Sequence, residues 1–129
     1  MKKPTHRFID VFHFTTDNSK PGRALSWVRI GDVYMSRLII SPGVATGNYY
    51  HKKTRVMFYV GRGEVVAAFE QVKTGEKKKM KVRPGKHVIH MPAYVAHCTK
   101  NVGTKPAVLV FFSNRKLRSG DDFEYKVLD

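Results

Sequence analysis

The sequence predicts an all-β domain, either a sandwich or a barrel of short strands. Turn signals made of Gly, Pro, Asn and Asp recur about every ten residues along the chain. The segments between them are rich in β-branched and aromatic residues, which favour strands. No segment sustains apolar residues at the helical spacing of about 3.6 residues. With 129 residues the chain is long enough for one domain, expected over residues 1–129, to bury a core without disulfides.

The first third of the chain predicts three strands. Arg7–Phe14 is expected to be the first strand because it carries three Phe and a Val, and Thr15–Gly22 is expected to be a loop because it is rich in Asp, Asn, Ser, Pro and Gly. Arg23–Ile30 and Val33–Ile40 follow as strands on either side of a turn at Gly31–Asp32.

The rest of the chain predicts a succession of short strands and turns. A long strand is expected over Tyr49–Val60, and the tight turn Gly61–Gly63 joins it to a hairpin partner over Glu64–Gln71. The later strands are expected over Lys77–Val82, His87–Met91, His97–Lys100 and Ala107–Phe112. We divide the domain into N-terminal strands over 7–30, a core over about 33–115 and a polar C-terminal tail over 116–129. Residues 119–122 of the tail either cap a helical turn or form a loop.

Charge is the strongest compositional signal. The chain has 24 Lys and Arg residues against 10 Asp and Glu, a formal net charge of +14. Such a charge attracts anions, but it does not indicate whether the anion is nucleic acid, an acidic lipid or a phosphorylated metabolite. Much of it lies in Lys73–Arg83, which is typical of a solvated edge strand and contains no interleaved aromatic residue, so nucleic acid is not an expected partner.

Targeting signals are not evident in the sequence. No apolar run reaches the roughly 18 residues of a membrane span, so no membrane partner is expected. The N-terminus lacks the apolar stretch of a signal peptide. The single cysteine, Cys98, excludes an internal disulfide and suits a reducing compartment. The expected location is therefore the cytoplasm.

Two histidine motifs are the main functional signal. They read Gly43-x5-Tyr49-x-His51-x4-Val56-x6-Gly63 and Pro92-x4-His97-x3-Asn101. Side chains alternate faces along a strand, so Tyr49 and His51 are expected to point into one cavity, and a strand through His97 can present its ring there too. His87 and His90 have opposite parity, and we expect His90 to point inward. The candidate cavity therefore combines one tyrosine with three histidines.

Two chemistries are open to such a cavity. A catalytic zinc or non-haem iron site needs three protein ligands and an open position, and His51, His97 and His90 are the set that can supply them. Because Val56 cannot coordinate an ion, we expect no cofactor and keep this divalent-metal site as the alternative. Without a metal, His51 can take a proton from a carbon next to a carbonyl while Tyr49 or His90 returns one.

Basic side chains near the same strands suit an anionic ligand. Arginine gives bidentate contacts to phosphate oxygens, and lysine adds a point charge. The candidate ligand-binding residues are Arg23, Arg37, Lys53 and Arg55, together with His97. We therefore expect a small anionic substrate.

The motifs resemble those of the small cupins of nucleotide-sugar metabolism. The matching segments are Gly47–Lys53, Gly61–Glu64, Val88–Pro92 with His97, and Phe112–Asn114 followed by Asp121–Phe123. Over roughly residues 33–125 the chain is similar to the dTDP-sugar 3,4-ketoisomerases and to the C-terminal cupin domain of capsular-polysaccharide reductases, both relatives of the dTDP-4-dehydrorhamnose 3,5-epimerases. The resemblance implies a cupin double-stranded β-helix, a jelly-roll barrel that forms a homodimer and binds a nucleotide-linked keto sugar in its mouth.

The resemblance also implies roles for single residues. In the ketoisomerases a His-x-His pair supplies the proton-transfer groups, so His51 keeps one position and Tyr49 replaces the other. In the capsular relatives His, Glu and a final His hold a metal, and this chain keeps only His51 and His97 of that set. The resulting hypothesis is a nucleotide-sugar isomerase or epimerase, and the alternative is a noncatalytic cupin that binds a sugar or another small anionic ligand.

Overall fold

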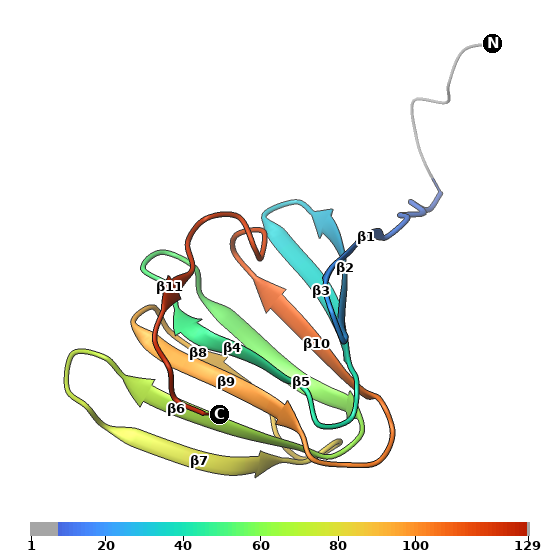
Figure 1. The fold of residues 1–129 in the computed structure, drawn as a ribbon. Coiled ribbons are helices and arrows are strands. Elements are labelled where there is room, and N and C mark those ends of the chain that lie inside the picture. The colour runs from blue at the N-terminus through green and yellow to red at the C-terminus, as the bar shows by residue number, and fades with distance from the viewer. Residues whose placement is uncertain (1–7, 129) are drawn as a thin grey trace.

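All regular secondary structure in the described part of the chain is β-strand. The computed structural model describes residues 8–128. The strands are β1 (Thr15–Lys20), β2 (Arg23–Ile30), β3 (Val33–Ile40), β4 (Ala45–Tyr50), β5 (Val56–Arg62), β6 (Val65–Gln71), β7 (Lys77–Val82), β8 (Ile89–Met91), β9 (Val95–Asn101), β10 (Ala107–Ser113) and β11 (Phe123–Glu124), as Figure 1 shows. The same residues contain no helix long and apolar enough to span a membrane.

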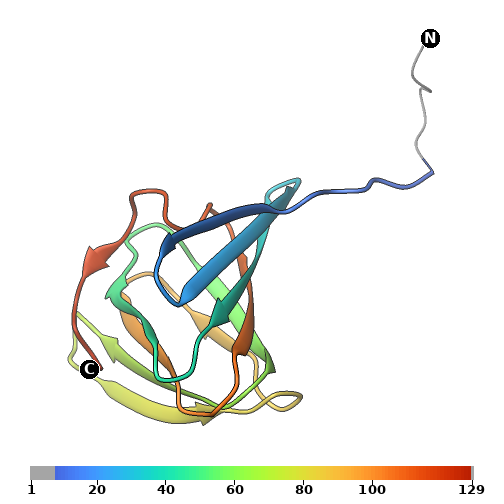
Figure 2. The same cartoon turned by 45° about the vertical axis from the view of Figure 1, so that its right-hand side comes forward.

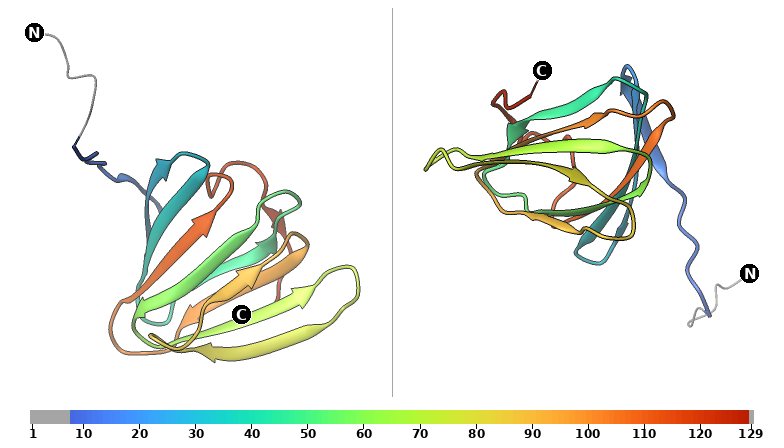
Figure 3. Two further views of the ribbon diagram at one scale, coloured as in Figure 1. Left: turned by 180° about the vertical axis from the view of Figure 1, so that it is seen from behind. Right: turned by 90° about the horizontal axis from the view of Figure 1, so that it is seen from below.

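The strands form two antiparallel sheets that curve around a common interior (Figures 2 and 3). The six-stranded sheet has the order β1-β2-β3-β10-β5-β8, and the five-stranded sheet has the order β11-β4-β9-β6-β7. β10 lies between β3 and β5, and β9 lies between β4 and β6, so the chain crosses repeatedly from one sheet to the other. This connectivity is that of a jelly roll, and the expected single-domain, all-β architecture is confirmed.

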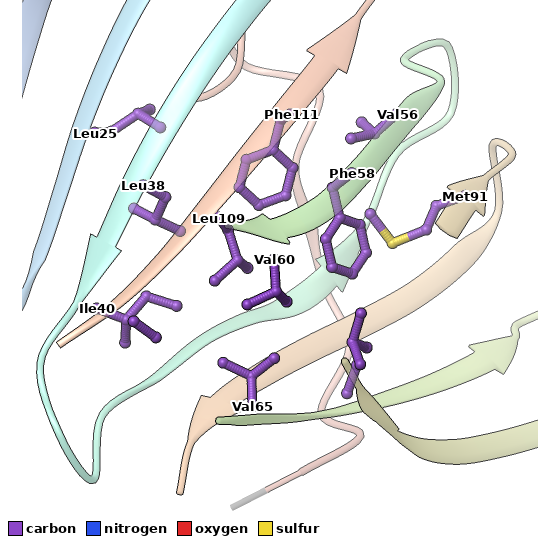
Figure 4. Packing of buried hydrophobic residues seen from close by; sticks show 13 residues of the cluster. Leu25, Leu38, Ile40, Val56, Phe58, Val60, Val65, Met91, Leu109 and Phe111 are labelled. Carbon is purple, nitrogen blue, oxygen red and sulfur yellow. The ribbon is translucent and has the colours of Figure 1, made fainter. Parts of the chain in front are cut away.

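The apolar core fills the space between the sheets (Figure 4). β5 illustrates how alternation builds it: Val56, Phe58 and Val60 point inward and are at most 2% exposed, whereas Met57 and Tyr59 point outward. Burying one such side chain contributes about 1.5–3 kcal/mol. The core thus fixes the strands on which the candidate site is built.

The N-terminal strand assignment is wrong. Residues 8–14 form no strand, and Arg7 lies outside the described residues. The first strand is instead β1, in the segment expected to be a loop. Pro21 and Gly22, the latter with φ +74°, form a tight turn that folds β1 back onto β2. Because backbone groups make this pairing, the polar side chains of β1 do not prevent it.

Two further assignments differ in detail. The strand expected over Tyr49–Val60 is divided into β4 and β5, with a loop over residues 51–55 between them. Residues 119–122 form a loop rather than a helical turn, and β11 follows. The other strands lie where they were predicted to within two residues, and β2, β3 and β7 have the predicted bounds.

Gly47 sets the register of β4 against β9. Its φ is +114°, and a Cβ at this position would lie 2.5 Å from the His97 carbonyl oxygen. The register between the strands shifts between Gly47 and Tyr49, and the shift brings Tyr49 opposite His97. The positive φ of Gly47 therefore helps to place Tyr49 of the first histidine motif opposite His97 of the second.

Candidate functional site

The candidate site is a cavity between the two sheets. It is lined by the polar residues Thr46, Tyr49, His51, His97 and Thr99, the apolar residues Leu25, Leu38, Val56, Met91, Phe111 and Leu117, the cations Lys20 and Arg118, and Gly47. The polar residues come mainly from β4 and β9 of the five-stranded sheet, and most of the apolar ones come from the six-stranded sheet. The cavity thus has a polar wall facing an apolar one, the kind of lining that suits an amphipathic ligand.

Three rings meet on the polar wall. Tyr49 and His97 make an edge-on contact with centroids 4.9 Å apart. His51 lies 5.3 Å from Tyr49 and 5.5 Å from His97. The expected inward position of His90 is wrong: His90 is exposed, and Met91 points into the cavity instead. The alternation of side chains predicted the inward residues of β4 correctly. It failed on β8 because this three-residue strand begins two positions later than expected.

His51 is held by the C-terminal segment. Its Nδ1 lies 2.8 Å from the carbonyl oxygen of Asp121 and 3.1 Å from Oδ1 of Asp122. Both neighbours are acceptors, so Nδ1 carries a proton and Nε2 is the atom that exchanges one. Burial would lower the pKa of His51, but the hydrogen bonds to Asp122 and Asp121 and the charges of both carboxylates raise it above its ordinary value.

Asp121 fixes the loop that follows β4. Its carboxylate accepts hydrogen bonds from the backbone N–H groups of Lys52, Lys53 and Thr54 and from the Thr54 hydroxyl, at 2.8–3.2 Å. Burial opposes ionisation, but the four donors together outweigh it and hold the pKa of Asp121 well below its usual range. Because the side chain satisfies three N–H groups, the chain leaves the sheet at His51 rather than continuing as one strand.

An aromatic ladder holds the segment that carries Asp122. The ring of Phe123 stacks on Tyr50 at 5.6 Å, and Tyr50 stacks on Tyr94 at 5.9 Å. Lys52 Nζ lies 4.1 Å from the Phe123 ring centroid, and Lys73 Nζ lies 3.9 Å from that of Tyr94, so a cation covers each end of the stack. Phe123 follows Asp122 directly, and the ladder therefore positions the carboxylate beside His51.

The other two rings are held uncharged. Burial lowers the pKa of His97 to about 4, and the nearby His51 adds to the effect. His97 Nδ1 donates to the Val95 carbonyl oxygen at 3.2 Å, which leaves Nε2 as an acceptor. Burial and the Asp122 charge raise the pKa of Tyr49, so its phenol keeps its proton. The wall therefore combines a base, a neutral imidazole and a hydroxyl donor.

The cations at the cavity are not those expected from the sequence. Arg37, Lys53 and Arg55 are exposed and do not line the cavity. Arg23 is half-buried and donates to the carbonyl oxygens of Ala45 and Pro21. The cavity is lined instead by two other cations, Lys20 and Arg118. Arg118 Nη1 is held 2.9 Å from the Asp17 carboxylate, which joins the C-terminal loop to β1.

The donor set does not fit a metal. Among residues 8–128 no three His, Cys, Asp or Glu side chains gather so that they could hold an ion. Val56, only 2% exposed, occupies the position that the resemblance assigns to a metal-binding Glu, and His90 points away. Two imidazoles and a protonated phenol remain, fewer ligands than a catalytic site needs. The absence of a cofactor stays a prediction.

Sequence reasoning missed Asp122 and Arg118. Both lie in the polar tail, about seventy residues from His51. The segment Asp121–Phe123 formed part of the motif resemblance, but no role was assigned to it. Alternation along strands cannot find a carboxylate that reaches the cavity from a loop.

Fold and site together define the class: the protein is a small cupin of the kind related to the dTDP-4-dehydrorhamnose 3,5-epimerases. A family model described as the polysaccharide biosynthesis C-terminal domain matches residues 24–123, and the chain belongs to that family.

Solved structures share the fold. The capsular polysaccharide assembling protein CapF from Staphylococcus aureus matches with a TM-score of 0.78 and 22% identity, covering 91% of this chain and 33% of CapF. Recombinant oxalate oxidase in complex with glycolate matches with a TM-score of 0.67 and 22% identity, covering 87% of this chain and 64% of that one. At these identities the likeness establishes a cupin barrel.

A curated relative is closer in sequence. Glucose-6-phosphate isomerase from Pyrococcus abyssi is 30% identical over 103 residues, which cover 72% of this chain and 51% of that protein. The chain therefore spans about half the length of this relative.

Proposed function

We propose that the protein is a nucleotide-sugar isomerase or epimerase that moves a proton at a carbon next to the carbonyl of a keto sugar. The observation that carries the proposal is the hydrogen bond from His51 Nδ1 to the Asp122 carboxylate, in a cavity that also holds the protonated phenol of Tyr49. A histidine oriented by a carboxylate and a nearby hydroxyl donor are the groups that such chemistry requires.

His51 acts as the base. Its Nε2 takes the proton from the carbon, the C–H bond breaks, and the electron pair moves onto the carbonyl oxygen to give an enolate. Asp122 stabilises the imidazolium that forms. Tyr49 then gives its proton to a carbon of the enolate, and His51 returns the abstracted proton to the phenolate directly or through water. Reprotonation of the same carbon on its opposite face gives an epimer. An isomer forms when the hydroxyl on the deprotonated carbon gives its proton to the enolate oxygen, directly or through water, and the former carbonyl carbon receives the proton of Tyr49.

The surroundings support an anionic, extended substrate. Lys20 and Arg118 line the cavity, where they would bind a diphosphate. A second depression shares Lys20, Gly47 and Tyr49 with the first and continues to Tyr125 and Lys126, with room for a nucleoside beyond the diphosphate. Family membership supports sugar chemistry, and the isomerase relative supports carbonyl migration as the type of reaction.

Proton exchange is the direct test. The protein is incubated in D2O with dTDP-4-keto-6-deoxyglucose, and deuterium at the carbons next to the carbonyl is followed by NMR. We expect exchange in the wild type, its loss in His51→Asn, and unchanged exchange in His90→Asn, because His90 lies outside the cavity. Tyr49→Phe should still exchange the proton that His51 removes while forming little product. Exchange that survives His51→Asn contradicts the assignment of the base.

A noncatalytic cupin is the second candidate, favoured by Val56 in place of the carboxylate of the capsular relatives. It predicts that the wild type binds a nucleotide sugar in calorimetry without exchange or turnover. Fructose 6-phosphate is tested in parallel, because the curated relative is named for a sugar phosphate. Metal analysis of untagged protein, with and without a chelator, tests the predicted absence of a cofactor.

A further inference from the structure

β7 is an open edge of the five-stranded sheet. The order of that sheet is β11-β4-β9-β6-β7, so β7 pairs with β6 on one side and has no neighbouring strand on the other within residues 8–128. Figure 1 shows β7 at the margin of the molecule. One row of its backbone N–H and C=O groups therefore faces away from the sheet, and such a row is a template for an added strand. With six residues the edge is about 20 Å long.

Lysines occupy most of this edge. Met80 of β7 packs against the core, so Lys77, Lys79 and Lys81, which have the opposite parity, point to the outer face of the sheet. Lys78 points to the other face, and all four lysines are exposed. The edge thus presents a line of cations along the strand.

Carboxylates of the same chain neutralise little of this charge. Lys77 Nζ lies 3.8 Å from the Glu70 carboxylate, and this is the one ion pair that β7 makes among residues 8–128. Glu70 is also engaged by the Tyr125 hydroxyl. Lys126 of the C-terminal segment lines a shallow depression together with Lys77 and Lys79, which adds a further cation beside the edge.

The arrangement suits an extended anion. Lys77 and Lys81 are four residues apart, about 13 Å along the strand, too far to converge on one phosphate or carboxylate group. β7 contains no aromatic residue on which a nucleic-acid base could stack. The lysines also repel a second copy of the same strand, so the edge does not pair with itself.

We infer that β7 takes up an acidic, extended segment of a partner protein as an added strand. Backbone groups of that segment complete the ladder, and acidic side chains at every second position lie opposite the outward lysines. Opposite charges that face each other across strands attract, so the lysines that reject a second copy select an acidic partner. No residue of β7 lines the cavity or the depression beside it, so the inference is independent of the proposed function.

A defined peptide tests the inference. The probe is a blocked peptide that alternates Glu with Thr and Val, and its binding to the full chain is followed by NMR. We expect backbone amide shifts concentrated in β7 and slower hydrogen exchange of β7 amides in the complex. A peptide with Gln in place of Glu lacks the charge, and one that is N-methylated throughout keeps the charge but cannot donate to a ladder. Each should bind at least about tenfold more weakly.

Paired variants separate the edge from the net charge of the chain. Lys79→Gln/Lys81→Gln removes two outward lysines of β7. Arg29→Gln/Arg115→Gln makes the same change in charge at two exposed positions outside the five-stranded sheet and is the matched control. The test pair should raise the Kd of the acidic peptide about twofold to thirtyfold, as expected for the loss of two cross-strand charge pairs. The control pair should leave the Kd unchanged, and both should keep the wild-type circular dichroism and melting temperature.

Several results would overturn the inference. The first is no binding of the acidic peptide up to about 1 mM, a limit that corresponds to a very weak complex. The second is equal binding of the N-methylated peptide, which shows polyanion contact without strand addition. The third is an equal loss in the control pair, which shows attraction by net charge alone. Binding to phosphatidylserine vesicles that depends on Lys79 and Lys81, without binding of the peptide, would assign the edge to a lipid surface instead.

Discussion

Replacing Asp122 by Asn tests whether the carboxylate tunes the base. The substitution keeps the size of the side chain and removes the charge that lies 3.1 Å from Nδ1 of His51. A hydrogen bond to a charged group contributes about 1.5–3 kcal/mol. The Asp121 carbonyl oxygen, 2.8 Å from the same nitrogen, remains in place and keeps the ring oriented. The loss should therefore fall toward the lower end of that range.

The variant should lower the pKa of His51 and slow proton exchange about tenfold to a hundredfold, as follows from about 1.4 kcal/mol per factor of ten. The ring resonances of His51, followed by NMR during a pH titration, report the pKa directly. Asp32→Asn, in the exposed turn between β2 and β3, makes the same change in net charge far from the cavity and is the control.

Stability provides an independent check with a defined sign. Because the pKa of His51 is raised in the folded state, the ion pair stabilises the fold fully below the ordinary histidine pKa of about 6.5. That contribution is lost as the pH rises through the higher folded value. Asp122→Asn should therefore destabilise the protein most at about pH 5–6 and less at pH 9. An unchanged His51 titration, or a stability loss that grows with pH, would refute the reasoning.

The remaining predictions concern the supports of the site. Gly47→Ala should lower the free energy of unfolding, measured by urea denaturation, by at least about 3 kcal/mol, because the new Cβ meets the His97 carbonyl oxygen. Gly75 also has a positive φ but lies in open space, so Gly75→Ala should lower it by about 1–2 kcal/mol. Equal losses in the two variants would contradict the close contact at Gly47. Phe123→Ala should lower the pKa of His51, slow proton exchange and lower the free energy of unfolding by about 1–3 kcal/mol. Phe123→Leu should restore more of the stability than of the exchange rate. Asp121→Asn should destabilise the fold by about 1.5–3 kcal/mol at pH 7. Because the pKa of Asp121 is depressed in the folded state, this difference should begin to shrink only as the pH falls below the ordinary Asp value of about 4, and it should shrink progressively from there. A pH-independent loss in thermal melting would contradict this.

The strands and their faces were largely predictable from local pattern. Val33–Ile40 is bounded by strong turn residues and alternates between the core and the outside, so its bounds and its buried residues follow directly from the sequence. Residues 8–14 show where the same reasoning fails. Their phenylalanines favour a strand, but a strand needs a neighbour with free backbone groups, and the Pro21–Gly22 turn brings β1 to that edge instead.

The site was predictable only in part, for a related reason. Tyr49, His51 and His97 lie on or beside strands, where parity fixes direction, and they meet as the spacing indicates. Asp122 and Arg118 reach the cavity from a loop whose path depends on tertiary contacts, chiefly the capture of backbone N–H groups by Asp121. A sequence pattern carries no information on such a path.

The C-terminal segment has a consequence for how the protein is handled. After Asp122 the chain crosses the five-stranded sheet, where the Asn48 side chain accepts hydrogen bonds from the backbone N–H groups of Val127 and Leu128, and the Tyr125 hydroxyl donates to Glu70. An expression boundary placed near residue 120 would keep the ten longer strands and leave His51 without both of its acceptors. Such a fragment would be less stable, because it lacks Asp121 and Phe123, and it would lack the carboxylate beside His51. The C-terminal segment should accordingly be kept intact when tags, fusions or proteolytic fragments are designed.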